Sequence, residues 1–152
     1  MLAELLLPDH IRLNLEAATP EEALRELVSI LKLHEKARVL ILNLLTEREK
    51  LGSTGIGKGI AIPHCRSLIL SKLTLAVGRF PKGVPFDALD KKPSHLFFLV
   101  AAPPRDKGNQ YLLTLGAIAK VAKDMGKNDK LCTAETPEEF LVRLRELEGK
   151  GK

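Results

Sequence analysis

His64 is the residue of this chain best placed for chemistry, because it follows a run rich in glycine. Four of the residues 52–63 are glycines, and glycine lets backbone N–H groups turn toward one anion such as phosphate. A neutral imidazole nitrogen is available near pH 7 to attack a phosphoryl group or to accept a proton. The pattern therefore indicates a histidine that receives a group or a proton beside a bound anion.

The residues around His64 indicate how its side chain is positioned. Residues 60–62 form a short apolar run, which is typical of a buried strand. Pro63 has no backbone N–H and a fixed φ, so we expect it to end strand pairing where His64 begins. A helix predicted over residues 36–50 should bring Arg48 to the mouth of the glycine loop.

The glycine loop must be distinguished from a nucleotide site. Residues 52–58 match the pattern GxxxxGK of nucleoside triphosphatases up to its last letter. Gly59 then stands where Ser or Thr should hold magnesium, and the charged residues 46–50 stand where a buried strand should precede the loop. The dinucleotide fingerprint GxGxxG fails as well. The sequence therefore argues against binding of ATP or of a dinucleotide.

The composition limits the class of protein. A chain of 152 residues with 45% hydrophobic residues can form one globular domain, expected over residues 1–148 with a flexible tail at 149–152. Its apolar runs are too short to cross a bilayer, so we expect a cytoplasmic protein without membrane insertion. The net charge of +5 comes with 19 interleaved acidic residues and few aromatics, which argues against nucleic acid as a partner.

The cysteines and the remaining histidines predict no metal site. Cys65 and Cys132 have no ligand spacing to each other or to the histidines. Cys65 directly follows His64 and is interpreted as a small packing residue, with a redox-sensitive neighbour as the alternative. His95 precedes a predicted central strand and is expected to make a structural hydrogen bond.

Helices and strands alternate along the chain without a repeat. Two helix starts, at residues 19–22 and 136–139, read Thr-Pro-Glu-Glu and combine a capping Thr, an early Pro and a Glu that completes a capping box. Strands are predicted at 11–15, 60–62, 73–78 and 95–101, and helices after each cap and at 36–50 and 111–124. The faces expected to be buried comprise Val39, Leu40, Leu42, Asn43 and Leu45 in one helix and Leu112, Leu115, Ile118, Ala119 and Ala122 in the other. The alternation favours an α/β fold, a single domain with a mixed β-sheet and helices packed on both faces.

Three segments together resemble a known family. They read Thr46-Glu47-Arg48-Glu49, Gly52-Ser53-Thr54-Gly55-Ile56-Gly57 and Ile60-Ala61-Ile62-Pro63-His64. They are similar to the signature of the fructose/mannitol-type enzyme IIA domains of the bacterial phosphotransferase system. Residues 84–90, Val-Pro-Phe-Asp-Ala-Leu-Asp, extend the likeness, which covers about residues 5 to 145. The resemblance implies the mixed-sheet fold of these domains.

The resemblance also implies a role for particular residues. His64 would be the phosphoacceptor, taking a phosphoryl group from the phosphohistidine of an HPr-like carrier and passing it on, with neither metal nor cofactor. Arg48 would stabilise the phosphate, since a guanidinium can donate two parallel hydrogen bonds to its oxygens. The loop residues that would support the phosphate are Ser53, Thr54, Gly55 and Gly57.

Tyr111 departs from the pattern of the sugar-transporting members, which carry a second active-site histidine at this position. A phenol can donate a hydrogen bond to a phosphate but carries no positive charge near pH 7. Together with the lack of a fused sugar carrier, Tyr111 favours the nitrogen-related, regulatory (PtsN-like) branch. The partners of such a protein would be the phosphocarrier and downstream regulatory proteins.

Two alternatives remain open at the level of sequence. A fructose- or mannitol-type component would pass the phosphoryl group to the IIB domain of a sugar permease. A degenerate domain would keep the fold as a binding module in which His64 is never phosphorylated. The joint presence of Arg48, the glycine loop and His64 argues against the degenerate domain.

Overall fold

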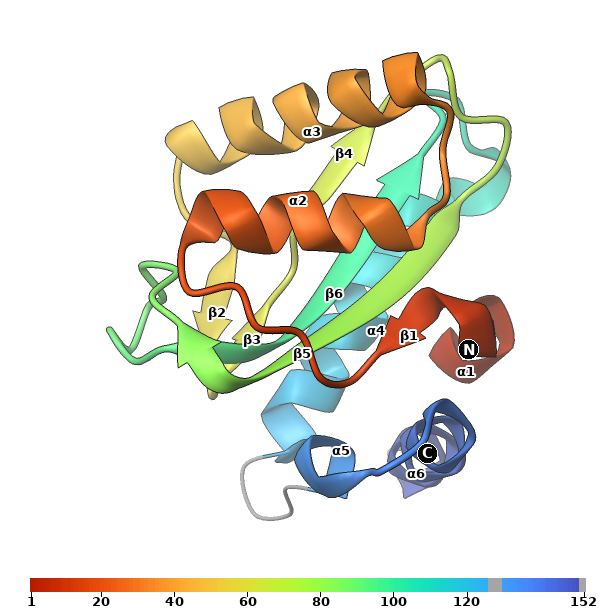
Figure 1. Cartoon of the computed structure of the whole chain (residues 1–152). Helices are drawn as coiled ribbons and strands as arrows, with labels where there is room; N and C mark the ends of the chain where they lie inside the picture. The colour runs from red at the N-terminus through yellow and green to blue at the C-terminus, as the bar shows by residue number, and fades with distance from the viewer. Residues whose placement is uncertain (126–129, 151–152) are drawn as a thin grey trace.

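The computed structural model describes residues 1–125 and 130–150. Its strands are β1 (Ile11–Arg12), β2 (Gly55–Gly57), β3 (Ile60–Ala61), β4 (His64–Arg66), β5 (Thr74–Val84) and β6 (Ser94–Ala102). Its helices are α1 (Leu2–Leu5), η1 (Pro8–His10), α2 (Pro20–Ile30), α3 (Glu35–Lys50), η2 (Lys107–Asn109), α4 (Gln110–Asp124), α5 (Lys130–Thr133) and α6 (Pro137–Lys150). The strands form one mixed sheet, with α2 and α3 on one face and α1, α4 and α6 on the other (Figure 1). The α/β fold with one mixed sheet is thereby confirmed.

Strand β6 is the centre of the sheet, whose order is β1-β5-β6-β3-β2. It pairs antiparallel with β5 along one edge, and on its other edge it pairs in parallel first with β3 and then with β4. The expectation that Pro63 ends strand pairing was wrong, because pairing resumes at His64, which lies opposite Val100. Pro63 therefore interrupts the strand pairing along this edge of β6 but does not end it. Its carbonyl accepts a hydrogen bond from the N–H of Val100 at 3.0 Å.

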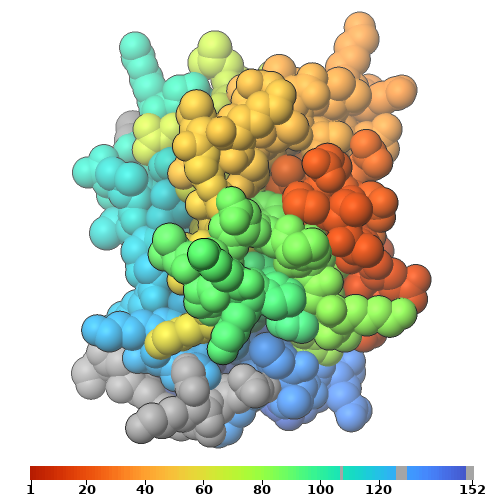
Figure 2. Space-filling model, turned by 90° about the vertical axis from the view of Figure 1, so that its left-hand side faces the viewer, coloured from red at the N-terminus to blue at the C-terminus, as the bar shows by residue number. Residues whose placement is uncertain are grey.

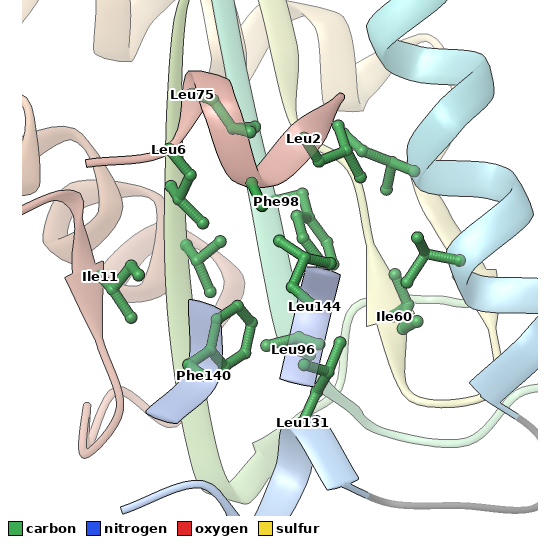
Figure 3. Close-up of a cluster of buried hydrophobic side chains, with 14 of the residues drawn as sticks. Leu2, Leu6, Ile11, Ile60, Leu75, Leu96, Phe98, Leu131, Phe140 and Leu144 are labelled. Carbon is green, nitrogen blue, oxygen red and sulfur yellow. The ribbon is translucent and has the colours of Figure 1, made fainter. Parts of the chain in front are cut away.

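The alternation of side chains along β6 divides the core into two layers. Leu96 and Phe98 face α1, α4 and α6, and Figure 3 shows them among side chains from those helices, including Leu2, Phe140 and Leu144. On the opposite face, the ring of Phe97 meets two other phenyl rings edge-on, with centroids 5.0 Å away for Phe80 and 4.9 Å away for Phe86. All the residues of β6 except His95 are buried, so this strand provides rigid support for the strands that pair with it.

The two predicted helix starts are confirmed. The N–H of Glu22 donates to Oγ1 of Thr19 at 3.3 Å, and the N–H of Glu139 donates to Oγ1 of Thr136 at 3.1 Å. Each bond satisfies one of the N–H groups that a helix leaves unpaired in its first turn. Helix α6 is longer than expected and includes residues 149 and 150 of the predicted tail, while residues 151–152 lie outside the described residues.

Several predicted boundaries and faces were wrong. The first strand ends at Arg12 instead of residue 15, and β5 extends six residues past Gly78 through a register shift between Arg79 and Val84. The green stretch that follows β5 lies at the centre of the molecular face shown in Figure 2 and protrudes from it. The side chains expected to be buried but found exposed are Val39, Leu40, Asn43, Leu112 and Ala119. The described helices include none that is long and apolar enough to cross a membrane.

Candidate phosphoryl-acceptor site

His64 is the first residue of β4, and its ring is fixed by the main chain just before it. Its Nδ1 lies 2.7 Å from the carbonyl oxygen of Ile62. A carbonyl only accepts, so Nδ1 carries the proton and donates, and Nε2 keeps its lone pair. The imidazole is half-buried and lines a groove of about 500 Å³. The sequence therefore builds an oriented nucleophilic nitrogen from three consecutive residues.

Arg48 reaches the same groove from the last turn of α3. Its Nη1 donates to the carbonyl oxygen of Gly52 at 2.8 Å, which holds the half-buried guanidinium beside the start of the glycine run. The lining of the groove comprises Leu44, Glu47, Arg48, Leu51, His64, Cys65, Arg66 and Tyr111. The structure thus brings Arg48 and His64 together along one groove.

Glu49 braces this arrangement, a role that its place in the segment Thr46-Glu47-Arg48-Glu49 did not predict. Its carboxylate accepts a hydrogen bond from the N–H of Thr54 at 3.0 Å and another, short one from the hydroxyl of Thr54. Burial raises the pKa of Glu49, opposed by the bonds from Thr54 and by the charges of Arg48 and His64. Glu49 therefore ties the end of α3 to the glycine run that leads to His64.

The glycine run is a hairpin instead of an open loop. Gly55 and Gly57 belong to β2, which pairs antiparallel with β3, and Gly57 and Gly59 have positive φ values of 90° and 77°. A Cβ on Gly55 would lie 3.0 Å from Cα of Ala88, so this position also needs glycine for a close approach of two backbones.

The polar groups of the glycine run have partners within the protein. The Gly55 N–H donates to Oγ of Ser53 at 3.0 Å, the Lys58 N–H donates to the carboxylate of Asp90 at 3.0 Å, and the Ser53 hydroxyl donates to the carbonyl of Phe86. Thr54 is engaged by Glu49, as described above. Support of a phosphate by Ser53, Thr54, Gly55 and Gly57 stays a prediction, and the geometry gives these residues a bracing role.

Tyr111 lies in the groove beside His64, with the two ring centroids 6.0 Å apart. Its side chain is buried, and its backbone N–H donates to the carboxylate of Asp106. Burial, with a smaller effect of Cys65, raises the pKa of Tyr111 to about 12 against the opposing charges of Arg66 and Arg48. The phenol is therefore uncharged at any physiological pH.

The remaining candidate residues have structural roles. His95 Nδ1 donates to the carbonyl of Phe80 at 3.1 Å, as predicted. Cys65 points away from solvent, and burial raises the pKa of its thiol to about 11, which supports the packing interpretation. A larger cavity of about 740 Å³ at the other end of β6, beside His95, contains none of the predicted site residues. Within residues 1–125 and 130–150, no three His, Cys, Asp or Glu side chains are grouped so that they could hold a metal.

A half-buried imidazole with a fixed tautomer, an arginine held beside it and a shallow groove over both define a domain of the phosphotransferase type. Residues 4–146 match the family described as phosphoenolpyruvate-dependent sugar phosphotransferase system, EIIA 2. The chain belongs to this family. Its members interact with phosphocarrier proteins and with IIB domains.

Relatives of both branches of the family are similar to this chain. The nitrogen regulatory protein of Pseudomonas aeruginosa is 34% identical over 90% of this chain and 90% of its own length. The fructose-specific EIIABC component of Bacillus subtilis is 33% identical over 92% of this chain, which spans only 22% of that protein. The crystal structure of the nitrogen regulatory protein IIA-Ntr from Neisseria meningitidis superposes with a TM-score of 0.79 at 31% identity, covering 94% of this chain and 98% of that one.

Proposed function

We propose that this protein is a phosphoryl carrier of the nitrogen-related type, which accepts a phosphoryl group on Nε2 of His64 from an HPr-like phosphocarrier in the cytoplasm. The observation that carries the proposal is the bond from Nδ1 to the Ile62 carbonyl, because it leaves Nε2 unprotonated in a groove that contains Arg48. Phosphoryl transfer to histidine requires an unprotonated ring nitrogen that is oriented to attack the phosphorus.

The proposed step conserves atoms and charge. The lone pair of Nε2 attacks the phosphorus of the donor phosphohistidine, and a new N–P bond forms on His64. The N–P bond of the donor breaks, and its electron pair returns to the donor ring. His64 keeps the proton on Nδ1, so the positive charge that develops on its ring is stabilised by the Ile62 carbonyl. Arg48 stabilises the negative charge on the phosphoryl oxygens in the transition state.

Exposed leucines line the groove or follow its residues closely in sequence. Leu51 lines it and is 85% exposed, Leu68 follows Arg66 closely in sequence and is 90% exposed, and Leu112 and Leu113 follow Tyr111. Large apolar side chains that remain this exposed mark contact sites for other proteins. We infer that the carrier covers these leucines while its phosphohistidine meets His64.

The regulatory role is favoured over sugar transport by Tyr111, which occupies the position where the resemblance would place a second histidine. A fructose-type IIA role is the second candidate, because the fructose-specific relative is similarly identical in sequence.

Intact-protein mass spectrometry tests the proposal. The protein is incubated with phosphoenolpyruvate, enzyme I and HPr, and wild type is compared with His64→Ala and with His34→Ala. His34 is exposed and stands at the N-cap position of α3, at the end of the helix opposite to Arg48. We expect one acid-labile phosphate on wild type and His34→Ala and none on His64→Ala. Phosphate on His64→Ala, or none on wild type with any carrier, would contradict the proposal and favour the degenerate binding module.

The two roles differ in where the phosphoryl group goes next. Phosphorylated protein, freed from the carrier, is mixed with a purified fructose- or mannitol-type IIB domain. We expect the phosphate to remain on His64, as suits a protein whose charge state selects its binding partner. Rapid transfer to the IIB domain would assign the sugar-transport role instead.

A further inference from the structure

We propose that Arg66 is a second phosphate-binding residue of the groove, held in place by stacking on the ring of Tyr111. This inference rests on the proposed function and names the group that supplies the second positive charge at its site. The carrying observation is that the guanidinium carbon of Arg66 lies 4.2 Å above the centroid of the Tyr111 ring.

The register of β4 places Arg66 on the side of the acceptor. Successive residues of a strand point to opposite faces, so His64 and Arg66 share one face while Cys65 points to the other. The burial pattern agrees, since His64 is half-buried, Cys65 is buried and Arg66 is exposed. Both His64 and Arg66 line the groove with Arg48.

Tyr111 provides a fixed platform for the guanidinium. Its buried ring lies at the start of α4, where its backbone N–H is bound by the carboxylate of Asp106. A guanidinium over an aromatic face is attracted to the ring and keeps its N–H donors free at its edge. Stacking therefore orders a side chain that would otherwise be mobile and leaves its donors available for an anion.

The charges of the groove leave Arg66 available for phosphate. Among residues 1–125 and 130–150, the ion pairs join Glu47 to Lys50, Glu139 to Arg143 and Glu148 to the Met1 ammonium, and none involves Arg66. Of the two carboxylates near the groove, Glu47 is neutralised by Lys50 at 2.9 Å and Glu49 is bonded to Thr54. Arg48 and Arg66 together can therefore bind a dianionic phosphoryl group from two sides.

A stacked arginine differs chemically from the histidine that the resemblance would place at position 111. A histidine loses its charge as the pH rises through its pKa, whereas a guanidinium stays charged throughout the physiological range. Arg66 with Tyr111 would thus supply a permanent charge where a histidine supplies a titrating one. This difference gives the inference a signature that a merely structural arginine would lack.

The first test measures the initial rate of His64 phosphorylation by HPr. We expect Arg66→Gln to slow it about 10- to 100-fold, Arg66→Lys to slow it less, and Tyr111→Phe to slow it less than Tyr111→Leu because the ring face is kept. Tyr111→Leu should approach the rate of Arg66→Gln. The matched control is Arg38→Gln, an exposed arginine near the opposite end of α3, which should phosphorylate like wild type. A wild-type rate for Arg66→Gln would overturn the inference.

The second test restores the charge at position 111. In the double variant Arg66→Gln/Tyr111→His, we expect the rate to recover below about pH 6 and to fall again at higher pH, relative to Arg66→Gln at each pH. Comparison with Arg66→Gln removes the pH dependence of His64 and of HPr, which both proteins share. A rate ratio that does not change with pH would contradict the role of a positive charge here.

The third test does not depend on transfer. Inorganic phosphate is titrated into the protein while the His64 ring is followed by NMR, and we expect Arg66→Gln to weaken binding several-fold relative to Arg38→Gln. If wild type is never phosphorylated but binds phosphate through Arg66, the proposed function fails and this inference survives. If Arg66→Gln binds phosphate like wild type, the inference fails whatever the outcome of transfer.

Discussion

His64 and Arg48 are both held by backbone carbonyls, those of Ile62 and Gly52. Each acceptor lies within four residues of its donor, so the two side chains depend on local backbone geometry more than on other side chains. This is why the site could be predicted from one stretch of sequence. Glu49 and Arg66 were missed, because the first acts through Thr54 and the second through a ring 45 residues away.

The charge on Arg48 should matter at the rate-limiting stage of phosphoryl transfer. Replacing Arg48 with Gln removes a guanidinium from the groove, and we expect phosphorylation of His64 to slow by about 10- to 1000-fold. Arg48→Lys should fall between Arg48→Gln and wild type, since an ammonium keeps the charge but loses the planar pair of donors. Quench-flow measurement with phosphorylated HPr gives these rates, and an unchanged rate for Arg48→Gln would remove Arg48 from the site.

The thiol of Cys65 should be inert although it neighbours the acceptor. Burial raises its pKa to about 11, so almost none of it is thiolate near neutral pH. We expect iodoacetamide at pH 7.5 to leave Cys65 unmodified in the folded protein and to alkylate it in urea, as read by peptide mass spectrometry. Fast alkylation of Cys65 in the folded protein would show that the thiol has an exposed, reactive state.

At the scale of elements, the sequence predicted which helices and strands exist better than where they end. Caps made by Thr19 and Thr136 are local chemistry and were confirmed. Strand β4 could not be predicted, because residues 64–66 form a strand only by pairing with β6. Both β3 and β4 pair with the same edge of β6, and Pro63 lies between them. The buried faces of α3 and α4 were predicted incorrectly for a similar reason, since the side of a helix that is buried depends on its position against the sheet.

The contact between α2 and the sheet depends on a glycine in β5. A Cβ added to Gly78 would overlap Cδ2 of Leu27 and lie 2.9 Å from Cδ1 of Leu15. We expect Gly78→Ala to lower the free energy of unfolding by about 1 to 3 kcal/mol through overpacking.

Gly116 provides the matched control for Gly78. It lies within α4, and a Cβ there would meet nothing within 4 Å. Gly116→Ala should therefore raise the free energy of unfolding by up to about 1 kcal/mol through helix propensity. Urea unfolding measures both variants, and equal stabilities of the two would contradict the proposed packing.

At the scale of the whole molecule, the two ends of the chain are joined. The carboxylate of Glu148 in α6 accepts hydrogen bonds from the N–H groups of Leu2 at 2.8 Å and Ala3 at 3.0 Å, and it pairs with the Met1 ammonium at 3.1 Å. These bonds fix α1 against α6 over the layer of core that contains Leu2 and Leu144 (Figure 3).

This junction should make stability depend on acid pH. Burial alone would raise the pKa of Glu148, but the bonds from Ala3, Leu2 and Met1 lower it below its ordinary value of 4.5. A carboxyl with a lowered pKa in the folded state stabilises the protein above pH 4.5, and the contribution is lost as the pH falls through the folded pKa. We expect Glu148→Gln to be less stable than wild type at pH 7, with the difference shrinking below pH 4.5. Urea unfolding across this pH range measures it, and a difference independent of pH would contradict the account.

The groove over His64 has one further consequence, which concerns the order of events in time. If His64 carries the phosphoryl group as proposed, a partner whose binding depends on its phosphorylation must touch the groove, which is also the surface where the donor delivers the group. Donor and partner cannot occupy that surface together. An abundant partner that prefers the unphosphorylated form would therefore compete with the donor and slow phosphorylation.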